Sequence, residues 1–452
     1  MPFDPVIFKA YDIRGIYPDQ LDEDTAYKIA QGYARIFKPG KAVVVGRDVR
    51  TCAPKIQAQI IQGLIDAGVD VVDIGLCSTD MFYFAVGNYQ YSGGIQVTAS
   101  HNPAEYIGAK MVLEGVVPIS EDNGLQDICK LVEEEVLVKK TTVGKLVKKD
   151  VLDDLIQFIK SKIVNHKYQP RKIVYNPNFG YQGVVLKKLV HELNLPFELV
   201  GLNEKPDGTF PKGRPDPFIP ENRIEFSQMV KDTKADLGVA WDADADRIFF
   251  CANGGVFVDA YYSTTLLIEE ILKNNPNEKI AYDPRYCWAQ IDAIKKFGGT
   301  PVISRVGHSF IKAKMREVNS VFSGESSGHT FYRDYWFAES GLLPLLDLLK
   351  ILDEKKSDML SLVEKLMKTY IISGEINSEV QDKKAVFEKI KIAYQDAEIS
   401  EVDGVSIEYS NWRANVRASN TEPLVRLNVE TRGNKKLMEE KRDELLKLIR
   451  GE

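Results

Sequence analysis

The first candidate for a reactive group is a serine in the polar stretch 98–103, Thr-Ala-Ser-His-Asn-Pro, which follows the apolar run 94–97. A predicted strand delivers the hydroxyl of Ser100 to a loop, with His101 beside it and Lys110 ten residues further on. Neighbouring side chains in an extended stretch point apart, so a serine–histidine pair of the hydrolase kind is not expected. Taken alone, the stretch is equally well interpreted as a turn.

Three aspartates at alternate positions form a second candidate group. Asp242, Asp244 and Asp246 follow the apolar run 235–241, and a period of two places them on one face if the strand continues. Ionised carboxylates about 4–5 Å apart repel each other by about 3–4 kcal/mol per pair at an effective dielectric constant of about 20. A bound dication removes this repulsion, and carboxylate oxygens suit Mg²⁺ better than a soft metal. Arg247 could hold a phosphate oxygen; a solvated acidic turn is the alternative.

A glycine-flanked loop offers groups that suit a sugar. Glu325 supplies an acceptor, and Ser326, Ser327 and His329 supply hydroxyl and imidazole partners. Vicinal sugar hydroxyls are held by such a mixture of groups. The same residues also suit the N-cap of a helix.

A further polar stretch near the C-terminus contains groups that bind phosphate. Arg417 is followed by Ser419, Asn420 and Thr421, and Arg426 lies on the next predicted strand. A guanidinium together with hydroxyl, amide and backbone N–H donors suits a phosphate dianion. A polar turn is the alternative.

Activation of Ser100 has to come from charged groups elsewhere in the chain. Arg14, Lys110 and His308 are the available candidates. Each of them alone is more often a surface or structural residue.

The elements that position these groups follow one pattern that occurs three times. An apolar strand, a helix and a second apolar strand succeed one another over 41–75, 171–201 and 278–305. This order predicts parallel α/β sheets. A further apolar strand then leads into the loop of Ser100, of Asp242 or of Glu325. Ligands gather outside the carboxyl ends of such strands, so three related domains are expected to turn their loops toward a shared cleft.

After about residue 366 the pattern changes to a helix near 382–396, alternating strands at 404–409 and 424–429, and an amphipathic helix at 435–450. This predicts a smaller α+β domain with an antiparallel sheet. The predicted domains are 1–150, 151–251, 252–365 and 366–452. The charged run 132–150 is interpreted as a solvated helix and linker.

Composition limits the partners and the compartment. A net charge of −6 over 452 residues argues against nucleic acid or an anionic membrane as the main partner. No signal peptide or membrane span is visible, and the cysteines are far apart, which excludes an obvious zinc site and favours a reducing compartment. A cytoplasmic protein is expected. The cysteines are Cys52, Cys77, Cys129, Cys251 and Cys287.

Five motifs together resemble the α-D-phosphohexomutase superfamily, in particular bacterial phosphomannomutase/phosphoglucomutase. They are Tyr-Asp-Ile-Arg-Gly at 11–15, the serine motif at 98–103, Asp-Ala-Asp-Ala-Asp-Arg at 242–247, Gly-Glu-Ser-Ser-Gly-His at 324–329 and Arg-Ala-Ser-Asn-Thr-Glu-Pro at 417–423. The resemblance runs from about residue 9 to about residue 430. It implies four domains around a central cleft, three of them similar α/β domains.

The resemblance also implies an activity and a role for each group. The enzyme would exchange hexose 1-phosphate and hexose 6-phosphate, of mannose and/or glucose, through phosphorylated Ser100 and a hexose 1,6-bisphosphate. Mg²⁺ would be bound by the phosphoserine and the aspartates. The other roles fall to three groups: Arg14, Lys110, Arg247 and His308 at the reacting end; Glu325, Ser327, His329 and Arg285 at the sugar; Arg417, Ser419, Asn420, Thr421 and Arg426 at the substrate's phosphate.

The chain departs from the family pattern at the sites that bind metal and sugar. Ala243 and Ala245 replace the usual glycines between the aspartates, and alanine disfavours positive φ. Ser326 stands where methionine is common, and Arg285 stands where lysine is usual. The alternatives left open are a phosphoglucosamine mutase, a metal-dependent sugar phosphatase and a catalytically silent sugar-phosphate binder. Monomer and homodimer are both compatible with the sequence.

Overall fold

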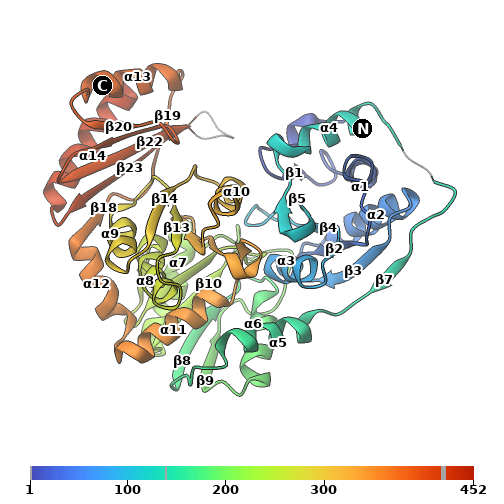
Figure 1. Cartoon of the computed structure of the whole chain (residues 1–452), viewed down its shortest axis with the longest axis horizontal. Coiled ribbons are helices and arrows are strands. Elements are labelled where there is room, and N and C mark those ends of the chain that lie inside the picture. Colours follow the sequence, from blue (N-terminus) through green and yellow to red (C-terminus); the bar gives the residue numbers. More distant parts are fainter. Residues whose placement is uncertain (1–2, 138–139, 419–423, 452) are drawn as a thin grey trace. The chain divides into compact units, whose positions relative to one another are not determined.

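The computed structural model describes residues 3–137, 140–418 and 424–451. Backbone contacts divide the chain into two units, which are described separately below. Unit 1 contains Met1–Phe257 and Gly328–Lys356, and unit 2 contains Val258–Ser327 and Ser357–Glu452. Figure 1 labels the helices and strands along the chain.

The first sheet of unit 1 has the strand order β1-β5-β4-β2-β3-β7, with β6 paired to β5. The strands from β4 to β7 in this order are parallel, while β5 runs antiparallel to β4 and β1 antiparallel to β5. The elements are β1 (Ile13–Ile16), α1 (Glu23–Phe37), β2 (Val43–Arg47), α2 (Ala53–Asp66), β3 (Val71–Leu76), α3 (Thr79–Asn88), β4 (Gly93–Val97), β5 (Tyr106–Leu113), β6 (Val117–Pro118), α4 (Leu125–Glu133) and β7 (Leu146–Lys148).

The second sheet of unit 1 has the order β12-β11-β10-β8-β9. Its elements are α5 (Leu152–Ile163), β8 (Arg171–Asn176), α6 (Gln182–Glu192), β9 (Phe197–Gly201), α7 (Pro220–Asp232), β10 (Leu237–Trp241), β11 (Ile248–Ala252) and β12 (Val256–Val258). Unit 1 also includes the antiparallel pair β16 (Thr330–Tyr332) and β17 (Ala338–Glu339), followed by α11 (Leu343–Lys355).

Unit 2 contains a parallel sheet in the order β14-β13-β15 and an antiparallel sheet in the order β18-β23-β22-β21-β20, with β19 paired to β23. The first part consists of α8 (Ala260–Asn274), β13 (Lys279–Tyr282), α9 (Trp288–Lys296), β14 (Thr300–Ile303), α10 (His308–Val318) and β15 (Phe322–Gly324). The second consists of α12 (Met359–Thr369), β18 (Tyr370–Ile372), β19 (Ile376–Glu379), α13 (Lys383–Ala393), β20 (Glu398–Ser400), β21 (Val405–Glu408), β22 (Trp412–Ala418), β23 (Leu424–Arg432) and α14 (Lys435–Arg450).

The repeated unit predicted from the sequence is present in the structure. In each copy the first strand lies between the second and the third, as β3-β2-β4, β9-β8-β10 and β14-β13-β15. The third strand is buried along its length in every copy, and a candidate loop follows its carboxyl end. The predicted fold class of mixed α/β domains with a smaller α+β C-terminal domain is confirmed; the predicted domain boundaries stay predictions.

Local signals explain where several helices begin and end. Asp22 caps α1 by accepting a hydrogen bond from the backbone N–H of Thr25 (2.8 Å), and Asn434 caps α14 in the same way. Gly451 ends α14 with a φ of +74°, a conformation that suits glycine. The predicted limits of α14, 435–450, agree with the structure.

Two expectations about local structure were wrong, and one helix was not predicted. The helix expected in the run 132–150 ends already at Glu133, the last residue of α4, and 146–148 form the edge strand β7. The helix α3 was missed because Thr79–Gly87 are buried on every side, so the segment has no amphipathic period. Arg417, expected in a loop, lies on β22.

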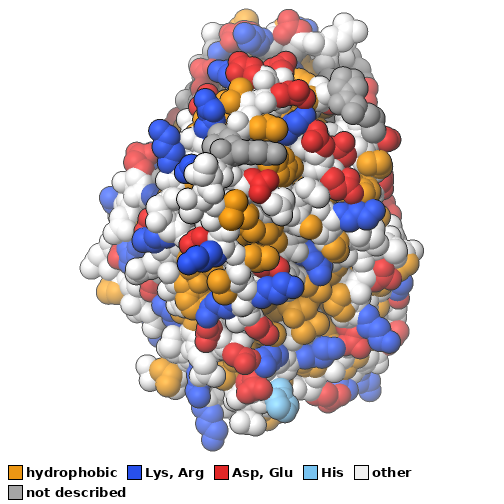
Figure 2. Space-filling model, turned by 90° about the vertical axis from the view of Figure 1, so that its right-hand side faces the viewer, with side chains coloured by type: hydrophobic (Ala, Val, Ile, Leu, Met, Phe, Trp, Pro, Cys, Tyr) orange, Lys and Arg blue, Asp and Glu red, His pale blue; other side chains and the backbone are white. Residues whose placement is uncertain are grey.

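The surface carries charges of both signs. Figure 2 shows lysine and arginine side chains interspersed with aspartate and glutamate side chains over the face in view, with hydrophobic side chains between them. Among the described residues, none of the helices is long and apolar enough to span a bilayer.

The loop after β10 keeps a left-handed residue although it lacks glycine. Ala245 has a φ of +62°, whereas Ala243 lies outside the positive-φ region. Both alanines are buried. The left-handed conformation costs an L-residue about 1–2 kcal/mol, so the loop retains the conformation at the expense of strain.

We therefore expect Ala245→Gly and Ala243→Gly to differ. Each substitution removes a buried methyl group and increases the chain entropy of the unfolded state. Together these two effects lower the free energy of unfolding by about 1–2 kcal/mol. Only Ala245→Gly also relieves the left-handed strain, so its free energy of unfolding should exceed that of Ala243→Gly by about 1–2 kcal/mol. Urea unfolding measures this difference, and equal losses in the two variants would contradict the account.

Candidate active site

Ser100 lies in the loop after β4 and is almost completely buried. Its hydroxyl donates a hydrogen bond to Asp242 Oδ2 (2.8 Å), and Nδ1 of His101 lies 3.0 Å from Ser100 Oγ. The expectation that the side chains of Ser100 and His101 point apart was wrong. Ser100 has a φ of +49°, so the chain is not extended there and the two side chains meet.

The His101 imidazole is held in its neutral form. Burial and the neighbouring cations Arg247 and Arg14 lower the pKa of His101 well below its usual value. Next to Ser100, the structure thus places the carboxyl group of Asp242 and an uncharged imidazole.

The aspartates of the loop after β10 converge as predicted. Oxygen atoms from Asp242, Asp244 and Asp246 all lie within 4.8 Å of one another, and all three side chains are buried. Oδ2 of Asp244 accepts hydrogen bonds from Thr79 Oγ1 (2.8 Å) and Thr98 Oγ1 (3.2 Å). In contrast, Oδ1 of Asp244 and Oδ1 of Asp246 are buried without a hydrogen-bond partner among the described residues. Unsatisfied carboxylate oxygens facing one another fit a divalent cation with oxygen ligands.

Lys110 extends from β5 and balances part of this negative charge. Its Nζ donates to Asp244 Oδ2 (2.6 Å) and to Asp246 Oδ2. Burial opposes the charged form, yet Asp244 and Asp246 outweigh it and raise the pKa of Lys110. Burial and the other two carboxylates raise the pKa of Asp242 well above its usual value. Burial acts in the same direction on Asp246, but Lys110 outweighs it and lowers the pKa of Asp246 well below its usual value.

Arg14 on β1 lies against the loop 98–105, which joins β4 to β5 and carries Ser100; we call it the serine loop. Its Nε donates to Asp12 Oδ2 (2.8 Å), and its Nη1 donates to Asn102 Oδ1 (2.9 Å). The predicted grouping of Arg14 with Ser100 and Lys110 therefore exists within unit 1.

Arg247 and a loop before α7 border the same cluster. The backbone N–H of Arg247 donates to Asp242 Oδ1 (3.2 Å), and its guanidinium lies 3.7 Å from Asp216. Asp216 also pairs with Arg214 (3.4 Å), and Nε of Arg214 donates to the carbonyl of His101 (3.1 Å).

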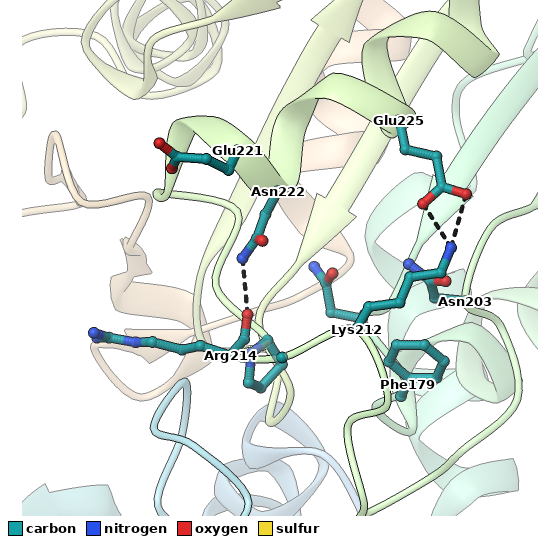
Figure 3. A pocket seen from close by; sticks show the side chains of 10 residues that line it. Phe179, Asn203, Lys212, Arg214, Glu221, Asn222 and Glu225 are labelled. Carbon is teal, nitrogen blue, oxygen red and sulfur yellow. Dashed lines mark hydrogen bonds and ion pairs between the residues drawn. The ribbon is translucent and has the colours of Figure 1, made fainter.

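The same loop lines a surface pocket of about 180 Å³. In Figure 3 the Arg214 side chain points away from the Lys212–Glu225 ion pair, and Asn222 donates to the carbonyl of Arg214 (2.8 Å). Asn222 in the pocket therefore holds the backbone of Arg214, and the side chain of Arg214 contacts the serine loop at His101.

His329 lies in unit 1, with the aspartate cluster. Nε of Arg247 donates to His329 Nε2 (3.3 Å), and Nδ1 of His329 lies 3.9 Å from Asp246 and 3.5 Å from Glu339. The other residues predicted to bind sugar, Glu325, Ser327 and Arg285, belong to unit 2.

In unit 2, Glu325 and Arg285 contact each other. Nη2 of Arg285 donates to Glu325 Oε1 (3.2 Å) and to Asp283 Oδ2 (2.8 Å). Glu325 Oε1 also accepts from the backbone N–H of Gly307 (3.0 Å), the residue before His308. The structure thus brings together Glu325, Arg285 and the start of α10.

The two arginines predicted to bind phosphate form a pair on adjacent strands. Arg417 and Arg426 are directly opposed in β22 and β23, and like charges at such positions repel. Glu375 bridges them, with Oε2 accepting from Arg417 (2.9 Å) and Oε1 accepting from Arg426 (3.3 Å). Burial opposes ionisation, but Arg417 and Arg285 outweigh it and lower the pKa of Glu375. The predicted residues Ser419, Asn420 and Thr421 lie outside the described residues.

Comparison with known proteins identifies the chain. It matches four family models: phosphoglucomutase/phosphomannomutase alpha/beta/alpha domain I over residues 5–138, domain II over 152–255, domain III over 259–370, and the C-terminal domain over 375–448. The chain belongs to the phosphoglucomutase/phosphomannomutase family. It is therefore a hexose phosphate mutase, an enzyme of the isomerase class.

Similar proteins match over nearly the whole length. A phosphomannomutase of Vibrio cholerae is 41% identical over 98% of each chain. A phosphohexose mutase of Xanthomonas campestris is 40% identical over 98% of this chain and 99% of its own. A solved structure of a phosphoglucomutase/phosphomannomutase family protein from Burkholderia thailandensis is 32% identical, covers 98% of each chain and has a TM-score of 0.89.

Sequence reasoning missed several residues of this family member's site. Thr79 at the start of α3 and Thr98 orient Asp244, while Asp216 and Glu375 pair with predicted arginines. Thr98 belongs to the stretch 98–103 that the sequence analysis singled out, although no role was assigned to it there. Nothing in the sequence near Thr79 marks it as a partner of Asp244, 165 positions away.

We expect Glu375→Gln to destabilise the protein in a pH-dependent way. Because the folded state lowers the pKa of Glu375, this carboxylate stabilises the fold above pH of about 4.5, its unfolded value, and the stabilisation is lost as the pH falls through the folded pKa. At pH 7 the variant should lose about 1–3 kcal/mol of unfolding free energy.

Denaturant unfolding at several pH values measures this loss. The difference in unfolding free energy between wild type and Glu375→Gln should become smaller below a pH of about 4.5. The exposed Glu379 on the neighbouring β19 provides the control, and Glu379→Gln should behave as wild type. A gap that widens on acidification would contradict the assignment.

Proposed function

We propose that this phosphohexomutase exchanges the 1-phosphate and 6-phosphate of a hexose by using Ser100 as a reversible phosphate carrier. The observation that supports the proposal most is the position of the Ser100 hydroxyl, 2.8 Å from Asp242 within a cluster of buried carboxylates. Cationic side chains, among them Lys110 and Arg14, surround this serine. Such a setting suits a serine that donates a phosphoryl group to the substrate and later accepts one from it.

Unit 1 supplies the groups for the transfer. Asp242, Asp244 and Asp246 would hold Mg²⁺ together with the phosphate on Ser100, since their unsatisfied oxygens match its ligand preference. When bound, Mg²⁺ offsets the charge of the phosphoserine and of the transferring phosphoryl group. Positive charge around the reacting phosphate would come from Lys110, Arg14 and Arg247. The imidazole of His329 would add a hydrogen-bonding group.

Unit 2 supplies the groups for recognition. Glu325, Ser327 and Arg285 offer acceptors and donors for sugar hydroxyls, and Arg417 with Arg426 offers guanidinium groups for the phosphate that the substrate already carries. Ser419, Asn420 and Thr421 would add hydroxyl and amide donors to that phosphate. His308, at the N-terminus of α10, would line the reacting end.

The reaction consists of two phosphoryl transfers. A free hydroxyl oxygen of the hexose phosphate bonds to the phosphorus on Ser100 while the bond from Oγ to phosphorus breaks; the sugar hydroxyl proton passes to a base, and Oγ takes up a proton. The product is a hexose 1,6-bisphosphate. After the bisphosphate has turned around, Ser100 Oγ loses its proton and bonds to the phosphorus of the other phosphate, and the sugar oxygen leaves and takes up a proton. Of the two candidates for the base, Lys110 and His308, we favour His308, because, against the effect of burial, Asp244 and Asp246 raise the pKa of Lys110 and stabilise its protonated form.

The sugars that we propose are mannose and glucose phosphates. The similar proteins from Vibrio cholerae and Xanthomonas campestris are named phosphomannomutase and phosphohexose mutase. Ser326 and Arg285 stand where the family pattern differs, so glucosamine phosphate is the second candidate. A coupled assay with the three hexose 1-phosphates decides between them. We place the enzyme in the cytoplasm, as a monomer or homodimer, with domains 1–150, 151–251, 252–365 and 366–452.

Ser100→Ala should abolish turnover and retain substrate binding. Without Oγ there is no carrier, so kcat should fall by at least about 10⁴-fold, the order that loss of a nucleophile costs, while calorimetry should give hexose-phosphate affinity within a few-fold of wild type. Ser161→Ala, at an exposed serine of α5, is the matched control. Turnover near the wild-type rate in Ser100→Ala would refute the carrier role.

Removal of divalent metal should stop the reaction. Treatment with EDTA followed by gel filtration is expected to lower kcat by at least about 100-fold, and added Mg²⁺ should restore it. Asp244→Asn removes one ligand charge and should weaken Mg²⁺ binding by about tenfold or more in titration calorimetry. Full activity in metal-free protein would rule out this part of the proposal.

A further inference from the structure

Arg50, just after β2, is an arginine with no exposed surface. Burying a guanidinium is unfavourable unless charge and hydrogen bonds are matched. Asp48 supplies the charge, with Oδ1 accepting from the backbone N–H of Arg50 (2.9 Å) and Oδ2 accepting from its Nε (3.2 Å).

The rest of the guanidinium is directed at the serine loop. Nη1 and Nη2 donate to the backbone carbonyl of the reactive serine and to three carbonyls that follow it in the chain, at 2.5–3.0 Å. The accepting residues are Ser100, Asn102, Pro103 and Tyr106. A guanidinium has five N–H donors in a rigid planar fork, and with the bond from Nε to Asp48 all of them are used.

The conformation at Ser100 requires such support. A φ of +49° is unfavourable for a residue with a side chain. The backbone N–H of Ser100 donates to Thr98 Oγ1 (2.8 Å), and its carbonyl accepts from Arg50 Nη2 (2.8 Å). Both peptide groups that flank this residue are therefore fixed, and the fixed turn directs Oγ to Asp242.

A loop from the second sheet's domain covers the other side of Arg50. The ring centroid of Phe210 lies 5.0 Å from the Arg50 guanidinium carbon, and Gly208 forms a β-bridge with Arg50. A Cβ at Gly208 would lie 2.7 Å from Arg50 Cα, so the close approach requires glycine there. The guanidinium is thus enclosed between this loop and the serine loop.

We propose that Arg50 is the positioning residue of the phosphate-carrying serine: it holds Ser100 in its left-handed turn through the loop carbonyls, so that Oγ points at the aspartate cluster. The inference rests on the proposed function of Ser100. Lysine at this position would keep the charge but offers three donors from one nitrogen, so it cannot reproduce the fork.

The first test measures the loop itself. In Arg50→Lys, amide hydrogen exchange of peptides covering 98–108 should be at least tenfold faster than in wild type, and a crystal structure should show Ser100 outside the left-handed region. The control is Arg171→Lys, which weakens another partly buried ion pair of unit 1, that of Arg171 with Asp353 (2.9 Å). It should leave exchange at 98–108 unchanged. An unchanged loop in Arg50→Lys would overturn the proposal.

The second test separates positioning from stability. Arg50→Lys should lower kcat by about 100-fold or more while KM for hexose phosphate and the Mg²⁺ dissociation constant stay within about threefold. A purely structural role predicts normal kcat per folded molecule, and that result would overturn the proposal. If Arg50→Lys does not fold, Asp48→Asn provides a milder change. In this variant kcat should fall about 5–20-fold, and amide hydrogen exchange at 98–108 should be faster than in wild type. Wild-type values of kcat and of exchange would overturn the proposal.

The two tests keep this inference apart from the proposed function. Hydrogen exchange and the crystal structure report on the serine loop without any turnover. A wild-type enzyme that converts none of the hexose 1-phosphates would refute the proposed function, and the role of Arg50 in holding the loop would still be decided by exchange.

Discussion

The candidate site of unit 1 depends on one constraint: three aspartate side chains are buried close together, and their negative charge has to be compensated. Oxygen atoms of Asp242, Asp244 and Asp246 converge in one loop, and Asp242 accepts a hydrogen bond from Ser100. This arrangement is unfavourable unless cations compensate it. Lys110 compensates part of the charge, and the threonine hydroxyls saturate one oxygen of Asp244. A divalent cation would satisfy the oxygens of Asp244 and Asp246 that lack a hydrogen-bond partner among the described residues.

The repeated strand order explains how distant segments supply this site. A third strand that lies beside the first of its repeat carries its loop to the carboxyl edge of the sheet. In unit 1 the loops after β4 and β10 bring Ser100 and the aspartates together, and in unit 2 the loop after β15 carries Glu325 to Arg285. One architecture, used three times, thus carries the three groups to which we assign the roles of phosphate carrier, metal ligands and sugar-binding carboxylate.

The sequence predicted the parts of the site that follow from short-range pattern. The sequence predicted that Ser100 and Asp242 each follow a buried strand, and the structure has both strands, because strand periodicity and loop position are local properties. The contact of His101 with Ser100 was missed because it depends on a positive φ at a serine, which no residue type announces. Thr79 and Arg50 were missed for another reason. Their roles come from partners many positions away, and a single threonine or arginine carries no local signal of that.

The central claim is that phosphate resides on Ser100 and is exchanged with the sugar. The most direct measurement is intact mass and peptide mapping of the Mg²⁺-loaded enzyme after incubation with a hexose 1,6-bisphosphate and then with excess hexose 6-phosphate. The account predicts one phosphate on the peptide containing Ser100, transferred to sugar in the second step with recovery of a bisphosphate. Phosphate found on Asp242, or released as inorganic phosphate with no bisphosphate formed, would contradict it and indicate a phosphatase.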